Sequence, residues 1–128
     1  MATNEEGRQT EIANELVEIA QTLAHSTRAV PRPSDSYELL ASLSAAQESL
    51  AQVYKQLAAW HEAAVDGKHY TGEDDHSIPG APAVGTHGHT TSLLTMAAAS
   101  ATEAAELVNE AHSANGVVRW FDEVKETA

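Results

Sequence analysis

The sequence predicts an all-α protein, an elongated bundle of three long helices followed by a short C-terminal helix. Two observations carry this prediction. Apolar residues between positions 34 and 66 recur at alternating spacings of four and three, which places them on one stripe of a helix. Two further segments show the same spacing, and all three are rich in Ala, Leu, Glu and Gln, which favour helices.

The first helix is predicted over about residues 3–25. Thr3 and Glu6 have the spacing of a capping box, in which each side chain satisfies a free backbone N–H group of the other. The apolar stripe of this helix is Ile12, Leu16, Ile19 and Leu23. Residues 26–33 then form a connector, because Pro31 and Pro33 lack N–H groups and move the residues before them out of the helical region.

The second helix, about residues 35–66, carries the longest apolar stripe of the chain. The stripe consists of Leu39, Leu43, Ala46, Leu50, Val53, Leu57 and Trp60. At 1.5 Å per residue this helix would be about 45 Å long, whereas a compact chain of this size has a radius of gyration of only about 14 Å. We therefore expect an elongated domain in which this stripe is the packing seam.

The third helix is predicted over about residues 90–115, with Gly116 suited to the left-handed position after a helix end. Its stripe is Leu93, Ala97, Ser100, Ala104, Leu107, Ala111 and Ala114. Most of these side chains are small and bury little area, so a neighbouring helix can approach closely. A short amphipathic helix over about 117–125, with Val117, Trp120, Phe121 and Val124 on one side, is expected to act as a lid.

Length and charge indicate a single domain and restrict its partners. The chain has 128 residues, no cysteine and a formal net charge of −12. Acidic residues are spread over all parts of the chain, and such a field repels phosphate backbones, which argues against direct binding of DNA or RNA. The N-terminus lacks the regions of a signal peptide and no apolar run has the length of a membrane span. We therefore expect a soluble, cytoplasmic protein that does not bind membranes.

Residues 66–90 form a predicted loop that contains most of the glycines and the candidate metal ligands. A loop of this length in a compact domain tends to be functional or disordered. His87 and His89 flank Gly88, and His76 lies nearby with several carboxylates. Imidazole and carboxylate groups are ligands of zinc, nickel and iron, so His87, His89 and His76 are candidate ligands of a divalent metal ion. The alternative is that these are exposed histidines without a ligand.

Acidic rows on two helices suggest a second kind of site. Glu103, Glu106 and Glu110 share a face of the third helix, and the first helix carries a similar row. Facing carboxylates could hold Mg²⁺ against a phosphate, and the pattern resembles the all-α nucleoside triphosphate pyrophosphohydrolases of the MazG type. That resemblance implies nucleotide hydrolysis. The chain departs from the family pattern because Glu5-Glu6 is followed by Arg8 and Gln9, and no Glu-x-x-Asp follows on a helix.

Tyr70 and Asp74 have the Tyr-x-x-x-Asp spacing that follows the helical hairpin of small type VII secreted proteins. The chain is similar to them in being small, helical and free of cysteine, but the Trp-x-Gly of their turn is absent from residues 26–33. The Ala-rich, acidic composition as a whole resembles that of small proteins from high-GC bacteria.

These patterns favour a non-enzymatic helical bundle that serves as a protein–protein interaction or assembly module. Because the third helix offers mainly alanine, one chain does not cover the whole apolar stripe of the second, and we expect a homodimer in which the second or third helices of two chains meet. The alternative is a metal-dependent or nucleotide-hydrolysing all-α enzyme that uses loop 66–90 and the carboxylates of the third helix. The sequence assigns no catalytic residue and no cofactor.

Overall fold

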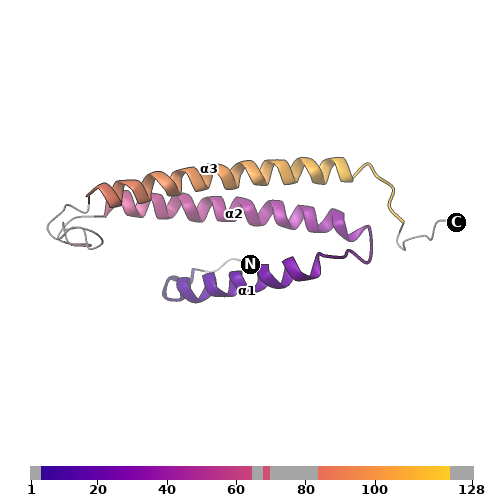
Figure 1. The fold of residues 1–128 in the computed structure, drawn as a ribbon, viewed down its shortest axis with the longest axis horizontal. Coiled ribbons are helices and arrows are strands. Elements are labelled where there is room, and N and C mark those ends of the chain that lie inside the picture. Colours follow the sequence, from indigo (N-terminus) through magenta and orange to yellow (C-terminus); the bar gives the residue numbers. More distant parts are fainter. Residues whose placement is uncertain (1–3, 65–67, 70–83, 122–128) are drawn as a thin grey trace. The chain divides into compact units, whose positions relative to one another are not determined.

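The computed structural model describes residues 4–64, 68–69 and 84–121. Within these ranges the chain forms a single 3₁₀ turn, η1 (Glu6–Arg8), and three α-helices, with no strand. The helices are α1 (Gln9–Ser26), α2 (Asp35–Ala63) and α3 (Val84–Asn115). The predicted all-α class and the three long helices are confirmed (Figure 1). The chain divides into two compact units, Met1–Ser36 with Trp120–Ala128 and Tyr37–Arg119, so the packing of α1 in a bundle remains a prediction.

Helix α1 begins later than predicted, and an arginine organises its first turns. Thr3 of the predicted capping box lies outside the described residues, and η1 precedes the helix. Arg8 forms ion pairs with Glu5, Glu11 and Glu15 at 3.0, 2.8 and 3.2 Å. The hydrogen bonds to Glu11 and then Glu5 raise the pKa of Arg8 above its ordinary value. Such pairs along a helix face favour the helical state over the unfolded chain.

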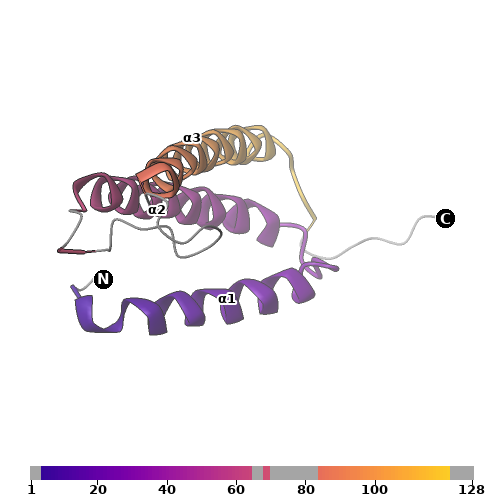
Figure 2. The same cartoon turned by 60° about the vertical axis from the view of Figure 1, so that its left-hand side comes forward.

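Helices α2 and α3 form an antiparallel hairpin, and both views show them side by side along most of their length (Figures 1 and 2). The buried residues of this hairpin are small. They are Ser44, Ala51 and Ala58 of α2, and Ala98, Ala101 and Ala105 of α3. Because these side chains extend little beyond the backbone, the two helix axes can approach closely.

A side-chain hydrogen bond shows how close the two helices are. The Ser44 hydroxyl of α2 donates to the carbonyl oxygen of Ala105 of α3 at 2.9 Å, and Ser44 is 6% exposed. A short serine side chain reaches a backbone atom of the neighbouring helix only when no large side chain separates them. The bond also satisfies a hydroxyl that would otherwise be buried without a partner.

The start of α3 and the chain after it differ from the sequence prediction. Helix α3 begins at Val84, so residues 84–89 belong to a helix and not to the predicted loop. Residues 117–121 contain no helix, and Val117, Trp120 and Phe121 are exposed. The predicted short helix is therefore wrong over 117–121, and its remaining residues lie outside the described part of the chain.

The close approach of the two helices predicts that the seam does not tolerate a larger side chain. We expect Ala51→Leu, at a position 3% exposed, to lower the free energy of unfolding by about 1–3 kcal/mol because it overpacks the seam. Ala59→Leu is the control, since Ala59 is exposed on the same helix. Urea unfolding followed by circular dichroism measures both. Equal effects at the two positions would contradict an alanine seam.

Candidate interaction surface

The buried residues of α2 lie one position after those of the predicted stripe. Along α2 the residues that are buried or half-buried toward α3 include Leu40, Ser44, Ala51 and Ala58, whereas the sequence indicated Leu39, Leu43 and their repeats. The spacing of four and three was therefore correct, but the stripe that pairs the helices is the neighbouring one. Since adjacent positions on a helix are about 100° apart, the predicted stripe lies about a quarter turn from the seam.

The predicted stripe of α2 forms an apolar surface on one side of the hairpin. Leu43, Val53, Leu57 and Trp60 are 36%, 45%, 44% and 55% exposed. Leu39 and Leu50, the other large members of the stripe, are half-buried. A row of large, partly exposed apolar side chains along one helix, interrupted only by Ala46, is unlike the scattered apolar residues of an ordinary surface.

Helix α3 places its own predicted stripe on the same side of the hairpin. Its buried residues Ala98 and Ala105 again lie one position after predicted members Ala97 and Ala104. The grooves lined by both helices lie on one side of the hairpin. The predicted stripes of α2 and α3 are turned the other way from the seam, so together they form the face on the opposite side. We call this face the leucine flank. Its members are Leu39, Leu43, Ala46, Leu50, Val53, Leu57 and Trp60 of α2, and Leu93, Ala97, Ser100, Ala104, Leu107, Ala111 and Ala114 of α3.

Every Asp, Glu, Lys and Arg between residues 36 and 63, and between 90 and 115, lies off the leucine flank. Five of them, Glu48, Lys55, Glu62, Glu103 and Glu106, line the grooves on the opposite side of the hairpin, which we call the charged flank. The other two, Glu38 and Glu110, are a multiple of seven residues from the groove residues Gln52 and Glu103, which places them toward the outer edges of the two helices. The leucine flank itself thus contains no charged residue, and most of the charged side chains line the other side.

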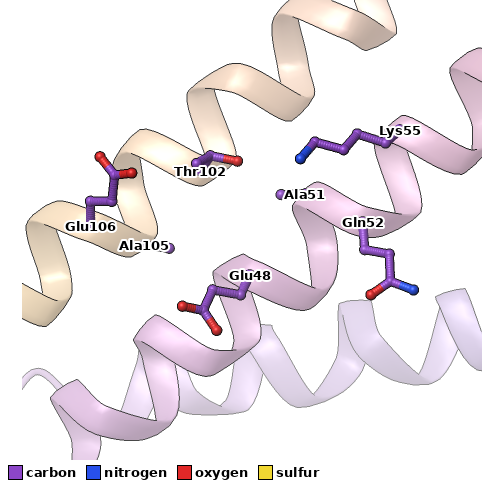
Figure 3. Close-up of a pocket in the computed structure, with 7 residues that line it drawn as sticks. All are labelled: Glu48, Ala51, Gln52, Lys55, Thr102, Ala105 and Glu106. Atoms are coloured by element: carbon purple, nitrogen blue, oxygen red, sulfur yellow. The ribbon is translucent and has the colours of Figure 1, made fainter.

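The charged flank contains an open groove with a single basic side chain. Its larger part has a volume of about 610 Å³ and is bordered by Lys55 and Glu62 of α2 and by Thr102, Glu103 and Glu106 of α3. Lys55 reaches from α2 toward Thr102 of α3, while Gln52 points away from α3 (Figure 3). The groove floor is made of the seam alanines Ala51, Ala58, Ala98 and Ala105. The groove is therefore the shallow outer side of the seam.

Trp60 ends the leucine flank and is in contact with two histidine rings. The ring of His61 lies edge-on to it with ring centroids 5.0 Å apart, and the ring of His69 does so at 5.8 Å. These contacts fix the orientation of an aromatic side chain that is still 55% exposed. A large, oriented and partly exposed tryptophan is the residue type most enriched among the dominant contacts of protein interfaces.

At the other end of the hairpin, Tyr37 of α2 stacks on His112 of α3, with ring centroids 4.0 Å apart and an angle of 27° between the rings. Gly116 follows α3, and a Cβ atom at that position would lie 3.1 Å from Cε1 of Tyr37. Its backbone is not in the left-handed region, so that prediction is wrong. Glycine fits there because a larger residue would crowd the Tyr37 ring and the carbonyl oxygen of Ser113, which would lie 3.3 Å from the same Cβ atom. Sequence reasoning missed Tyr37, since nothing local marks a tyrosine that pairs with a residue 75 positions away.

The candidate metal ligands are only partly described. His76 and the side chain of His87 lie outside the described residues, and His89 is exposed on α3. Both His87 and His89 belong to α3 and not to the predicted loop. No group of three or more histidines or carboxylates in the described part of the chain is placed to hold a metal ion. A metal site is therefore still a prediction.

The carboxylates proposed for nucleotide chemistry lie in different compact units. Glu11 and Glu15 of α1 bind Arg8, and Glu103 and Glu106 of α3 border the groove of the charged flank. A site shared by the two rows therefore stays a prediction. Tyr70 and Asp74, which carry the resemblance to type VII secreted proteins, lie outside the described residues.

Comparison with models of protein families, with curated proteins and with solved structures finds no match to this chain. Among the residues that the structure describes, no helix combines the length and apolarity needed to cross a membrane. The arrangement of the hairpin itself therefore carries the functional argument.

The contact between Tyr37 and Gly116 predicts that a methyl group at position 116 is unfavourable. Gly116→Ala should lower the free energy of unfolding by about 1 kcal/mol, because the Tyr37 ring must shift from its stack on His112. In a Tyr37→Ala background the cost should shrink or reverse, since alanine then only restricts the unfolded chain. A double-mutant cycle by urea unfolding measures the coupling. An unchanged cost in both backgrounds would show that Tyr37 is not the cause.

Proposed function

We propose that this protein is a non-enzymatic assembly module whose leucine flank binds a helical surface of another protein molecule. The observation that carries the proposal is the separation of the two flanks. Over residues 36–63 and 90–115 no charged side chain belongs to the leucine flank, whereas most large apolar side chains that do not contact the partner helix do. Solvation alone gives no reason to keep one side free of charge.

The size of the apolar side chains supports the same conclusion. The hairpin closes on five alanines and a serine, whereas the leucines, the valine and the tryptophan of α2 remain partly exposed. Burying one large apolar side chain contributes about 1.5–3 kcal/mol, compared with about 0.8 kcal/mol for a single buried methylene-sized group. Covering the partly exposed side chains of the leucine flank would therefore add apolar burial that the hairpin alone does not provide.

The geometry of the flank fits a helix better than a small ligand. The leucine flank is a stripe running along α2 and α3, with large side chains on one helix and small ones on the other. Amphipathic helices bind such surfaces through residues spaced three and four apart. The exposed Trp60 at one end and Leu43 toward the other provide anchors along its length.

A photo-reactive amino acid placed on each flank tests the proposal in cells that express the full chain. We expect position 50, on the leucine flank, to form covalent adducts with another protein molecule on irradiation, because Leu50 lies within the contact surface. Position 52 on the charged flank is the matched control, since Gln52 is exposed and points away from α3. Adduct mass and identity are read by mass spectrometry.

Two results would refute the assembly module. Equal adduct yields from positions 50 and 52 would show that the leucine flank is not a preferred contact. A cross-link from position 50 only to other residues of the same chain would show that the flank belongs to the internal core of the protein.

A further inference from the structure

We infer that the molecule bound by the leucine flank is a second copy of this chain, with α2 of each copy lying over α3 of the other. This inference rests on the proposed function, because it names the partner of the same surface. Four observations support it: the absence of charge on the flank, the unequal side-chain sizes on its two helices, its dimensions and the charge of the whole chain.

The distribution of charge allows two copies to meet on this flank. The chain carries a net charge of −12, so two copies repel each other through most of their surfaces. On the leucine flank neither copy brings a carboxylate into the centre of the contact, because no position of the flank is charged. A basic partner would instead be attracted to the charged flank. The leucine flank is therefore the surface on which a second acidic chain is accepted.

Side-chain sizes on the flank are complementary between the two helices. Helix α2 offers Leu43, Leu50, Leu57 and Trp60, whereas the positions of α3 beside them are mostly alanine and serine, with Leu93 near Trp60 as the exception. Where α3 has the large Leu107, α2 has the small Ala46. A surface with one large and one small side matches a copy of itself when the large row of each copy lies over the small row of the other.

A two-fold axis parallel to the helices produces this arrangement. Rotation about this axis places each helix of the second copy over the other helix of the first and keeps every residue at the same position along the axis. Helix α2 of one copy therefore faces α3 of the other, and the two run antiparallel. Within one chain, Ser44 is level with the segment that follows Ala105, and Ala51 is near Thr102. By the same register, Val53 of one copy is expected at the height of Ser100 of the other.

The flank also has the area that a stable dimer needs. Helix α2 has 29 residues, and two helices of about 10 Å diameter and about 40 Å length present a face of about 800 Å². Stable interfaces bury about 800 Å² on each partner. The leucine flank is therefore large enough for a self-contained homodimer of two hairpins.

Sedimentation of the purified full chain tests the second copy. We expect twice the chain mass of 13.6 kDa at micromolar concentration. Leu50→Glu with Leu57→Glu should raise the dissociation constant by at least about a hundredfold, because the carboxylates would be buried without partners. Gln52→Glu with Ala59→Glu adds the same charge on the charged flank and should leave the dimer unchanged. A wild-type monomer at all concentrations overturns the inference, as does equal dissociation in both double variants.

Cysteine pairing tests the arrangement without adding charge to the interface. The chain has no cysteine, so each single-cysteine variant carries one thiol. A mixture of Val53→Cys and Ser100→Cys chains should form the mixed disulfide about a hundred times faster than a mixture of Val53→Cys and Ala99→Cys, since effective concentrations across an interface are about millimolar. Ala99 lies in the groove of the charged flank.

The two experiments separate failure of this inference from failure of the proposed function. Predominant Val53–Val53 disulfides would overturn the α2-over-α3 arrangement. A monomer in sedimentation, together with adducts to a different protein from position 50, would overturn the second copy as partner while retaining the assembly module. A monomer without flank-specific adducts would overturn both.

Discussion

The close contact between α2 and α3 along a seam of alanines and a serine determines the rest of the hairpin. Small side chains at Ser44, Ala51 and Ala58, matched by Ala98, Ala101 and Ala105, allow the hydroxyl of Ser44 to reach the backbone of α3 at 2.9 Å. Once these residues form the seam, the helical repeat fixes the direction of every other side chain. The leucines of the predicted stripe must then lie to one side, and Lys55 and the glutamates that line the groove to the other.

The sequence predicted the helices and their repeat but not which stripe pairs them. A spacing of four and three identified both α2 and α3, because a sustained heptad pattern has no other stable arrangement. Choosing the stripe by hydrophobicity selected Leu39, Leu43 and Leu50, because leucine buries more area than alanine. The hairpin instead uses the stripe one residue later in both helices, since short side chains permit closer backbone contact. The composition of the two stripes alone does not show whether the larger buried area of leucine or the closer backbone contact of alanine determines which stripe pairs the helices.

Two other differences have local physical causes. Gly85 and Gly88 indicated a loop, yet α3 begins at Val84 and continues through both, because each glycine costs a helix only about 1 kcal/mol. Gly116 was assigned to a left-handed helix end, whereas its φ is not positive and the ring of Tyr37 lies close to it. That contact joins residues at opposite ends of the hairpin sequence. The candidate interaction surface was predictable as a set of residues, but its position on the outside of the hairpin required the register of the seam.

The placement of charge makes association compatible with a strongly acidic chain. In a dimer formed through the leucine flank, the carboxylates that line the groove of each hairpin lie on its outer side, so two layers of helices of about 10 Å diameter separate the two grooves. Electrostatic interactions are screened over about 8 Å at physiological ionic strength. These acidic residues therefore do not oppose the contact between the flanks. The same glutamates spread evenly around α2 and α3 would have placed like charges within the interface.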